Sequence, residues 1–297
     1  MQFAHLLLAL FIIIIWGINF VFLKISLDQM SPLLLCAVRF TLTSIPAIFF
    51  IKRPAVAFRW VIMYGLTMFA LVFLFVFIAM HAGVSPGLAA LILQLQVFFT
   101  LFFAALWWHE MPSLWQILGA LISFVGIGLI ATHIDHALTF SGIFFTIAAS
   151  AFWGIGNIIT KSMGKVNIIA LVAWGSFIAS IPMIFLSLYF DGIPEIIASY
   201  DRITWQGVFS VLFIVYGATW IGYGVWNWLL HRYPVTTVAP FTLLVPITAL
   251  VSSSLILAEP LQLWKVMASI LVICGLCVNL IGSRYYSRKK EPAQNHE

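Results

Sequence analysis

The residues best suited to bind a ligand are polar side chains that lie inside long apolar runs. Arg39 is the least expected of them, because it lies about eight residues into the run that begins at Pro32. An arginine near the centre of a membrane costs roughly 2.5–3.5 kcal/mol on insertion scales. Two interpretations stay open. The guanidinium attracts the carboxylate of a substrate, or it snorkels outward and bonds helix carbonyls.

Four polar or aromatic residues recur at helical spacing near residue 220. Tyr216, Trp220, Tyr223 and Asn227 follow one another at intervals of four, three and four, which places them on one helical face. Facing a cavity, they would offer aromatic walls, hydrogen bonds and a cation–π site for an ammonium group. The alternative is an aromatic stripe that faces lipid or the membrane interface.

Amide side chains lie inside three further apolar runs. Gln94 and Gln96 point about 200° apart on a regular helix, so at most one is expected to line a pathway while the other bonds a neighbouring helix. Asn19 shares a face with Trp16, and Asn157 shares one with Trp153. For both asparagines, a place in a cavity and a role as interhelical glue stay equally open.

Catalytic and metal-binding patterns are absent from the sequence. It contains no His-Glu-x-x-His motif and no aspartate pair within the apolar runs, so we expect neither an enzyme, nor a metal, nor a cofactor. Cys274 and Cys277 have redox-motif spacing but lie in an apolar run, and we interpret them as small packing residues.

The composition shows that lipid surrounds most of this chain. Of its 297 residues, 63% are hydrophobic and only 8% are charged, against about 25% charged in an average soluble domain. The net charge of +5 comes from basic residues in short loops and the tail, which suits anionic headgroups rather than nucleic acid. The first apolar run is too long for a signal-peptide core, and we expect it to remain as a spanning helix.

Ten apolar runs are long enough to cross a bilayer as helices, which takes about 20 residues. They predict an all-α polytopic membrane protein with spans near 4–24, 32–51, 60–80, 86–107, 114–132, 141–160, 168–190, 205–228, 235–257 and 264–282. Ten lysines and arginines lie in connections on the side of the termini and three on the other side, with Arg39 inside a span. This bias predicts that both termini are cytoplasmic.

The two halves of the chain repeat each other. Trp16-Gly17-Ile18 and Lys24 recur as Trp153-Gly154-Ile155 and Lys161, each offset by 137 positions. We therefore predict two five-helix repeats, at 1–136 and 137–283, followed by a basic cytoplasmic tail at 284–297. Because five is odd, the second repeat is inverted in the membrane, an arrangement typical of secondary transporters.

A second set of recurring residues carries a family resemblance. Glu110, Gln116, Gly119 and Gly126 resemble the pattern at the junction of helices 4 and 5 in the EamA-type branch of the drug/metabolite transporter superfamily. The second half holds a degraded copy, Glu259, Lys265, Ala268 and Gly275. The resemblance implies ten helices in two inverted repeats.

Other stretches resemble a subgroup of that family. Gln94-Leu95-Gln96 and Leu243-Leu244-Val245-Pro246 are similar to members that export cysteine and O-acetylserine. The resemblance implies an inner-membrane exporter of small cysteine-pathway amino acids. We expect export to proceed by alternating access. The alternatives are an exporter of broader amino-acid or metabolite specificity and, from another class, a pore. We expect the partners to be a small amino-acid-like substrate and the bilayer, with no nucleic acid, and we expect a monomer.

Overall fold

The computed structural model describes residues 2–109, 111–133, 139–233 and 238–290, and within those ranges the chain is helical and forms no strand. Nine helical segments there are long and apolar enough to cross a membrane, and a tenth apolar helix, Phe241–Leu257, is shorter. The prediction of an all-α polytopic protein is confirmed. Glu110 and Pro234 lie outside the described residues.

The first half of the chain contains five spanning segments, three of which are interrupted. Its elements are α1 (Phe3–Leu27), α2 (Pro32–Ser44), α3 (Ala47–Phe50), α4 (Phe58–Tyr64), η1 (Gly65–Leu71), α5 (Val72–His81), α6 (Pro86–Leu93), α7 (Gln96–Trp108) and α8 (Leu114–Ala131). Here η1 is a stretch of π-helix that joins α4 to α5.

The second half has the same kind of interruptions. Its elements are α9 (Phe140–Ser162), α10 (Ile168–Leu186), η2 (Ser187–Asp191), α11 (Gly192–Arg202), α12 (Trp205–Leu212), η3 (Phe213–Ile221), α13 (Gly222–Arg232), η4 (Ala239–Leu244), α15 (Val245–Leu257) and α16 (Leu263–Lys290). The segment η3 is again π-helical, and η4 is a 3₁₀ helix. Because α16 continues to Lys290, the first part of the expected tail is helical.

Short polar side chains fix where several helices begin. Ser31 precedes Pro32, and its hydroxyl accepts a hydrogen bond from the Leu34 amide at 3.0 Å. Ser113 and Gln116 form a reciprocal capping box at the start of α8. Gln116, part of the family pattern, therefore has a structural role in this chain.

Irregular turns interrupt the segments nearest the centre of the bundle. The π-helical stretches η1 and η3 widen the third and eighth segments, and a turn at Gln94–Leu95 separates α6 from α7. Prolines interrupt only some of the segments. Pro46 lies between α2 and α3 and Pro246 lies in the first turn of α15, whereas α10 continues past Pro182. Broken and π-helical turns leave some backbone N–H and C=O groups without their usual helical hydrogen bonds. At membrane depth such groups are tolerated only where they are buried in protein or line a cavity.

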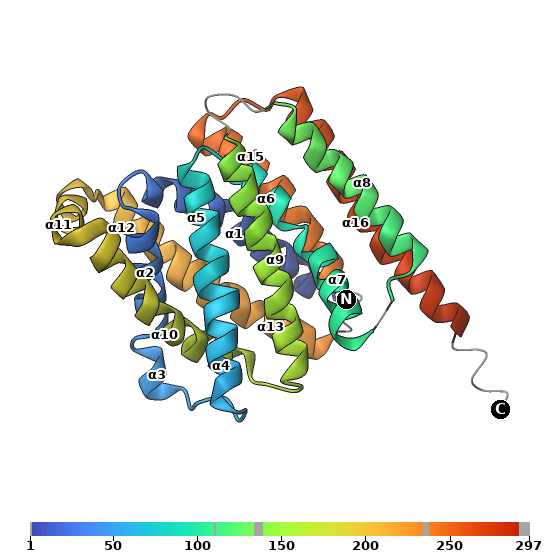
Figure 1. Ribbon diagram of the computed structural model, residues 1–297, viewed down its shortest axis with the longest axis horizontal. Coiled ribbons are helices and arrows are strands. Elements are labelled where there is room, and N and C mark those ends of the chain that lie inside the picture. Colours follow the sequence, from blue (N-terminus) through green and yellow to red (C-terminus); the bar gives the residue numbers. More distant parts are fainter. Residues whose placement is uncertain (1, 110, 134–138, 234–237, 291–297) are drawn as a thin grey trace.

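The helix pair α8 and α16 runs side by side along one edge of the molecule (Figure 1). The two backbones approach closely because glycines face each other. A Cβ added to Gly119 would lie 2.5 Å from the carbonyl oxygen of Gly275. In the rest of the bundle, α1 contacts α15, α12, η3, α13 and α6, whereas α9 contacts α5, η1, α7 and α6.

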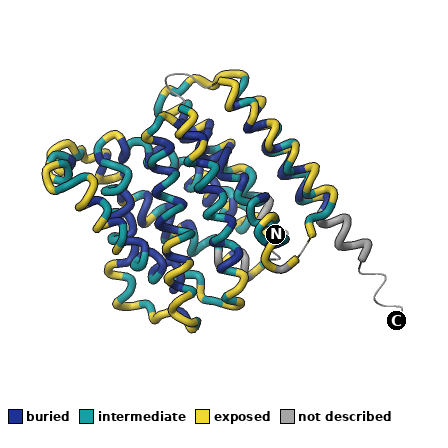
Figure 2. The backbone as a smooth tube through the Cα atoms, in the orientation of Figure 1, coloured by how far each residue is buried: buried dark blue, intermediate teal, exposed yellow. Residues whose placement is uncertain are grey.

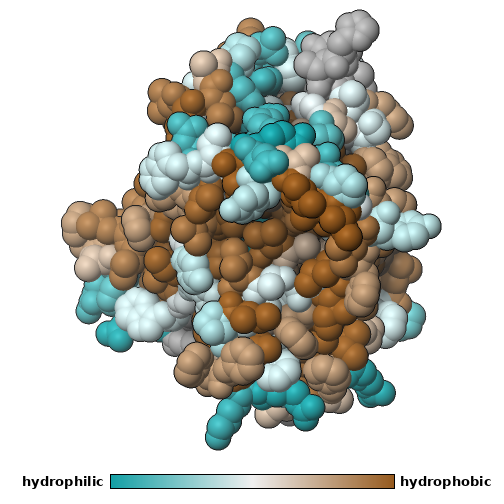
Figure 3. All heavy atoms as spheres, turned by 90° about the vertical axis from the view of Figure 1, so that its left-hand side faces the viewer, coloured by the Kyte–Doolittle hydropathy of each residue, from teal (hydrophilic) through white to brown (hydrophobic). Residues whose placement is uncertain are grey.

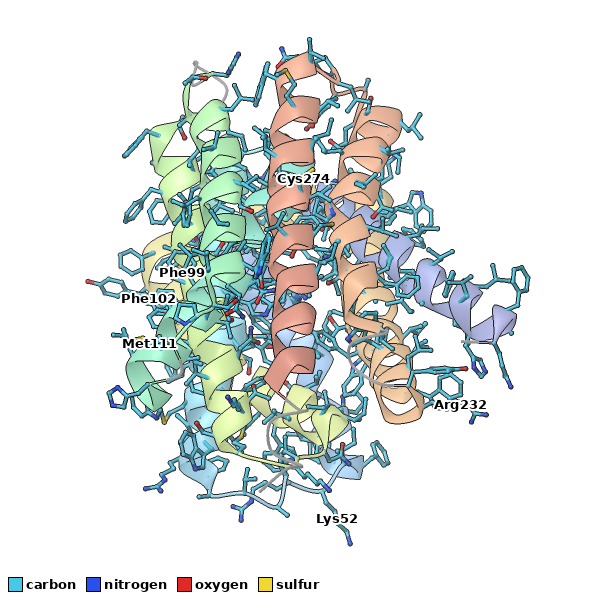
Figure 4. The ribbon with its side chains drawn as sticks, turned by 90° about the vertical axis from the view of Figure 1, so that its right-hand side faces the viewer. Lys52, Phe99, Phe102, Met111, Arg232 and Cys274 are labelled. Atoms are coloured by element: carbon cyan, nitrogen blue, oxygen red, sulfur yellow. The ribbon has the colours of Figure 1, made fainter. Side chains whose placement is uncertain are left out.

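Burial and surface chemistry agree with a molecule surrounded by lipid. Buried residues concentrate in the central helices, while the edge helices carry many exposed residues (Figure 2). Large apolar side chains such as Phe124, Val125 and Phe185 are exposed, and apolar surface covers the middle of the face in Figure 3. Lys52 and Arg232 lie toward the same end of the bundle (Figure 4).

Candidate substrate-binding cavity

A cavity of about 300 Å³ lies in the middle of the bundle, between the two halves of the chain. The elements around it are α1, α2, η1 and α5, the α6–α7 break, α9, η3 and α13, and the η4–α15 junction. Its walls are mostly aromatic and aliphatic. The polar residues among them are Asn19, Arg39, Gln94, Gln96 and Thr242, and none of the described lining residues carries a carboxylate.

Arg39 is the one charged residue among those lining side chains. Arg39 is only 4% exposed, so its side chain does not snorkel to the membrane surface. The guanidinium carbon lies 3.8 Å from the centre of the Phe73 ring. Its Nη2 makes one long hydrogen bond, at 3.5 Å to the hydroxyl of Thr219, while Nε and Nη1 are buried without a partner.

Aromatic rings form a wall that joins α1 to α13. The indole N–H of Trp16 donates to the carbonyl oxygen of Ala218 at 3.0 Å. The same ring lies 5.9 Å from Tyr223 and 5.2 Å from Trp226, measured between centroids. All three rings line the cavity.

Asn19 lies one helical turn after Trp16 and also lines the cavity. It is 7% exposed, and its side-chain oxygen has no hydrogen-bond partner. The structure therefore places Asn19 in the cavity wall, with its oxygen unpaired.

Gln94 and Gln96 both line the cavity, although a regular helix would point them apart. The reason is the turn at Gln94–Leu95, which interrupts the helix between them. Both amides also tie neighbouring elements together. Gln94 Nε2 donates to the carbonyl oxygen of Thr242 at 3.0 Å, and Gln96 Oε1 accepts from Asn157 Nδ2 at 2.9 Å.

Asn157 lies beside the cavity rather than in its wall. Its Nδ2 donates to Thr100 Oγ1 as well as to Gln96 Oε1, both at 2.9 Å. These bonds join α9 to α7. Of the two roles left open by the sequence, the structure places Asn157 as interhelical glue.

The expected stripe from Tyr216 to Asn227 does not line the cavity as one face. Tyr216 is 46% exposed, Trp220 packs against the hydrophobic core, and neither is among the cavity residues; only Tyr223 is. The expectation assumed an α-helix, but η3 is π-helical, with bonds from i to i+5. Ala218 and Tyr223, five apart, therefore face the cavity together. The Asn227 side chain lies outside the described part of the chain.

Two lining tryptophans were not predicted as site residues, although each had a signal. Trp153 is the repeat counterpart of Trp16, and Trp226 follows Tyr223 by one helical turn. Thr242 had no such signal, because its contribution depends on the 3₁₀ geometry of η4. Among the described residues, no cluster of histidine, cysteine or carboxylate side chains could hold a metal.

The ionised groups near the helix ends pair locally. Lys24, in the last turn of α1, contacts Asp28 just beyond the end of that helix at 2.6 Å. Arg202 contacts Glu195 within α11. Glu259 accepts a hydrogen bond from Ser253 at 2.5 Å. These contacts lie away from the cavity, at the ends of helices, where charged side chains near a membrane interface are expected.

Comparison with known proteins supplies the family. The model of the EamA-like transporter family matches residues 4–132 and 140–281. Proteins described as a probable amino-acid metabolite efflux pump, from Salmonella typhimurium strain LT2 and Escherichia coli strain K12, are each 36% identical to this chain. The alignments cover 93% and 94% of this chain, and 95% of each relative.

A solved crystal structure has the same fold. It superposes with a TM-score of 0.65 at 16% identity, covering 96% of this chain and 98% of its own. At that identity the likeness shows the fold alone. The two family matches span nearly the whole chain, and the apolar helices fit a transporter that crosses the membrane many times. This chain is therefore a member of the EamA-like transporter family.

Proposed function

We propose that the protein is a secondary transporter that exports small amino acids or their metabolites, of the cysteine and O-acetylserine type, across the bacterial inner membrane. The observation that carries the proposal is Arg39, a buried arginine with two unpaired nitrogens in the wall of a central cavity. The relatives described as amino-acid metabolite efflux pumps support the substrate class.

Arg39 suits the carboxylate that every such substrate carries. A guanidinium presents parallel N–H groups that match the two oxygens of a carboxylate. None of the lining residues that the structure describes is acidic, so none of them offers a carboxylate to those donors. The ring of Phe73 covers one face of the guanidinium.

Packing supports two inverted repeats that move against each other by alternating access. Helix α1 packs on α15 and on α12–η3, and α9 packs correspondingly on α7 and on α5–η1. The third and eighth segments are both π-helical, and the fourth and ninth are both irregular where they meet the cavity. The family model matches once in each half. Broken helices beside a midplane site are typical of transporters built from inverted repeats.

The same account gives the orientation and the residues that meet the substrate. Both termini are cytoplasmic, in keeping with the basic residues at the end of the bundle that holds Lys52 and Arg232 (Figure 4). The substrate contacts are drawn from the lining residues Trp16, Asn19, Arg39, Gln94, Gln96 and Tyr223.

The apolar walls of the cavity favour a second candidate, an exporter with a broader amino-acid spectrum. Side chains such as Phe20, Met68 and Leu93 would accept larger apolar substrates as readily as a thiol or an acetyl group. Competition by a panel of amino acids against labelled O-acetylserine separates the two candidates. A pore would instead give single-channel conductance and flux that does not saturate.

Substitution of Arg39 tests the proposal. Hydrogen bonds to charged groups contribute about 1.5–3 kcal/mol, so Arg39→Gln should weaken binding of O-acetylserine about 10- to 150-fold. Binding of O-acetylserine methyl ester, which lacks the carboxylate, should change far less. Arg39→Lys keeps the charge and should give an intermediate loss. Equal weakening of acid and ester by Arg39→Gln would contradict the carboxylate role.

A further inference from the structure

The cavity contains a second unpaired group, whose hydrogen-bonding demand is opposite to that of Arg39. The side-chain oxygen of Asn19 is a buried acceptor without a donor, whereas Nε and Nη1 of Arg39 are buried donors without an acceptor. Both residues line the same cavity of about 300 Å³. Buried polar groups are nearly always hydrogen-bonded, and Asn19 and Arg39 differ from other unpaired buried groups such as Ser26 in lining the cavity. A ligand in the cavity would supply both missing partners.

The surroundings of Asn19 suit a cation. Trp16 lies three residues before it on α1, and Tyr223 and Trp226 stand beside Trp16 within ring-contact distance. Aromatic faces attract an ammonium group, and an amide oxygen accepts its hydrogen bond. Among the described lining residues the one cationic side chain is Arg39 of α2, whose guanidinium lies against Phe73 of α5.

From these observations we propose that Asn19 recognises the ammonium group of the substrate, so that the cavity selects zwitterions over simple carboxylic acids. The Asn19 oxygen accepts an N–H bond while the rings of Trp16 and Trp226 face the charge. Arg39 holds the carboxylate, so this inference rests on the proposed function. Because neutral groups hold the ammonium, the site needs no acidic residue of its own.

Three ligands separate the roles of Asn19 and Arg39. They are O-acetyl-L-serine, its deaminated analogue acetoxypropanoate, and its methyl ester. The first carries both charges, the second only the carboxylate and the third only the ammonium. Binding is measured calorimetrically to the full-length protein in lipid nanodiscs, in mildly acidic buffer so that the acetyl group stays on oxygen.

The variant is Asn19→Leu, which keeps the size of the side chain and removes the acceptor. The wild type should bind O-acetylserine at least tenfold more tightly than acetoxypropanoate, and Asn19→Leu should abolish that preference. Binding of acetoxypropanoate itself should stay within about threefold. Asn19→Asp, which retains an acceptor, should keep the preference for the ammonium group.

Ser26→Ala is the matched control. Ser26 is on the same helix, is fully buried and has an unpaired hydroxyl, but it does not line the cavity. Its substitution should leave all three affinities unchanged. If Asn19→Leu weakens the binding of O-acetylserine and of acetoxypropanoate equally, or changes neither affinity, the proposal for Asn19 is overturned.

The failure of the proposed function gives a different result. If Arg39→Gln weakens the binding of O-acetylserine and of its methyl ester equally, Arg39 does not bind the carboxylate and the proposed function is contradicted. Even then, the affinities of wild type and Asn19→Leu for the methyl ester can be compared, and their difference measures the contact between Asn19 and the ammonium group. The ester should bind at least several-fold more weakly to Asn19→Leu, and unchanged binding would overturn the ammonium role by itself.

Discussion

The close contact between α8 and α16 predicts opposite outcomes for two glycines on the same helix. A Cβ at Gly119 would lie 2.5 Å from the carbonyl oxygen of Gly275 and 3.0 Å from the backbone nitrogen of Asn279. Neither is the movable end of a flexible side chain, so the helices must separate. A Cβ at Gly128 would meet nothing within 4 Å. Gly128→Ala is therefore the matched control for Gly119→Ala.

The magnitude follows from comparing these two variants. Both gain the same helix propensity of about 0.5–1 kcal/mol, which cancels in the difference. What remains is the cost of overpacking at Gly119, typically about 1–3 kcal/mol. Taking about 2 °C per kcal/mol for a chain of this size, Gly119→Ala should melt roughly 2–6 °C below Gly128→Ala.

The assay is thermal unfolding of both purified variants in the same detergent. Unfolding is monitored by size-exclusion chromatography and by tryptophan fluorescence. Gly128→Ala should melt at or slightly above the wild-type temperature. Equal melting of the two variants would refute the reasoning, because it would mean that α8 and α16 do not approach through Gly119.

Two further predictions concern the cavity and its supports. Asn157→Leu removes both bonds between α9 and α7. At about 0.6–1.7 kcal/mol for each interhelical bond, it should lower thermal stability by roughly 1–3 kcal/mol; unchanged stability would contradict the glue role. Tyr223→Ala should weaken O-acetylserine binding about tenfold through the lost ring face. Tyr216→Ala, on an exposed residue of the same segment, should leave calorimetric affinity within twofold. A larger effect at Tyr216 would show that the stripe faces the cavity after all.

Regular features of the fold could be predicted from local sequence signals. Pro32 and Pro86 mark helix starts, because a proline there loses no hydrogen bond, and apolar length gives the spans. Arg39 was identifiable as a candidate because charge in an apolar run is costly. The sequence left open whether it snorkels, and its burial answers that question.

Features that depend on irregular backbone could not be predicted in the same way. We predicted one common face for the residues from Tyr216 to Asn227, and opposed faces for Gln94 and Gln96. Both predictions assumed a regular α-helix. The π-helix η3 and the turn at Gln94–Leu95 break that assumption. Asn157 could have been glue or site, because an amide serves both roles equally well.

Exchange of labelled O-acetylserine tests the central claim most directly, that this protein carries amino acids across the membrane through the cavity at Arg39. Purified protein is placed in liposomes preloaded with unlabelled O-acetylserine, and entry of the external label is followed. We predict saturable uptake that depends on the preloaded substrate and is lost in Arg39→Gln. Uptake that neither saturates nor requires preloading, or that is the same in Arg39→Gln, would contradict the account.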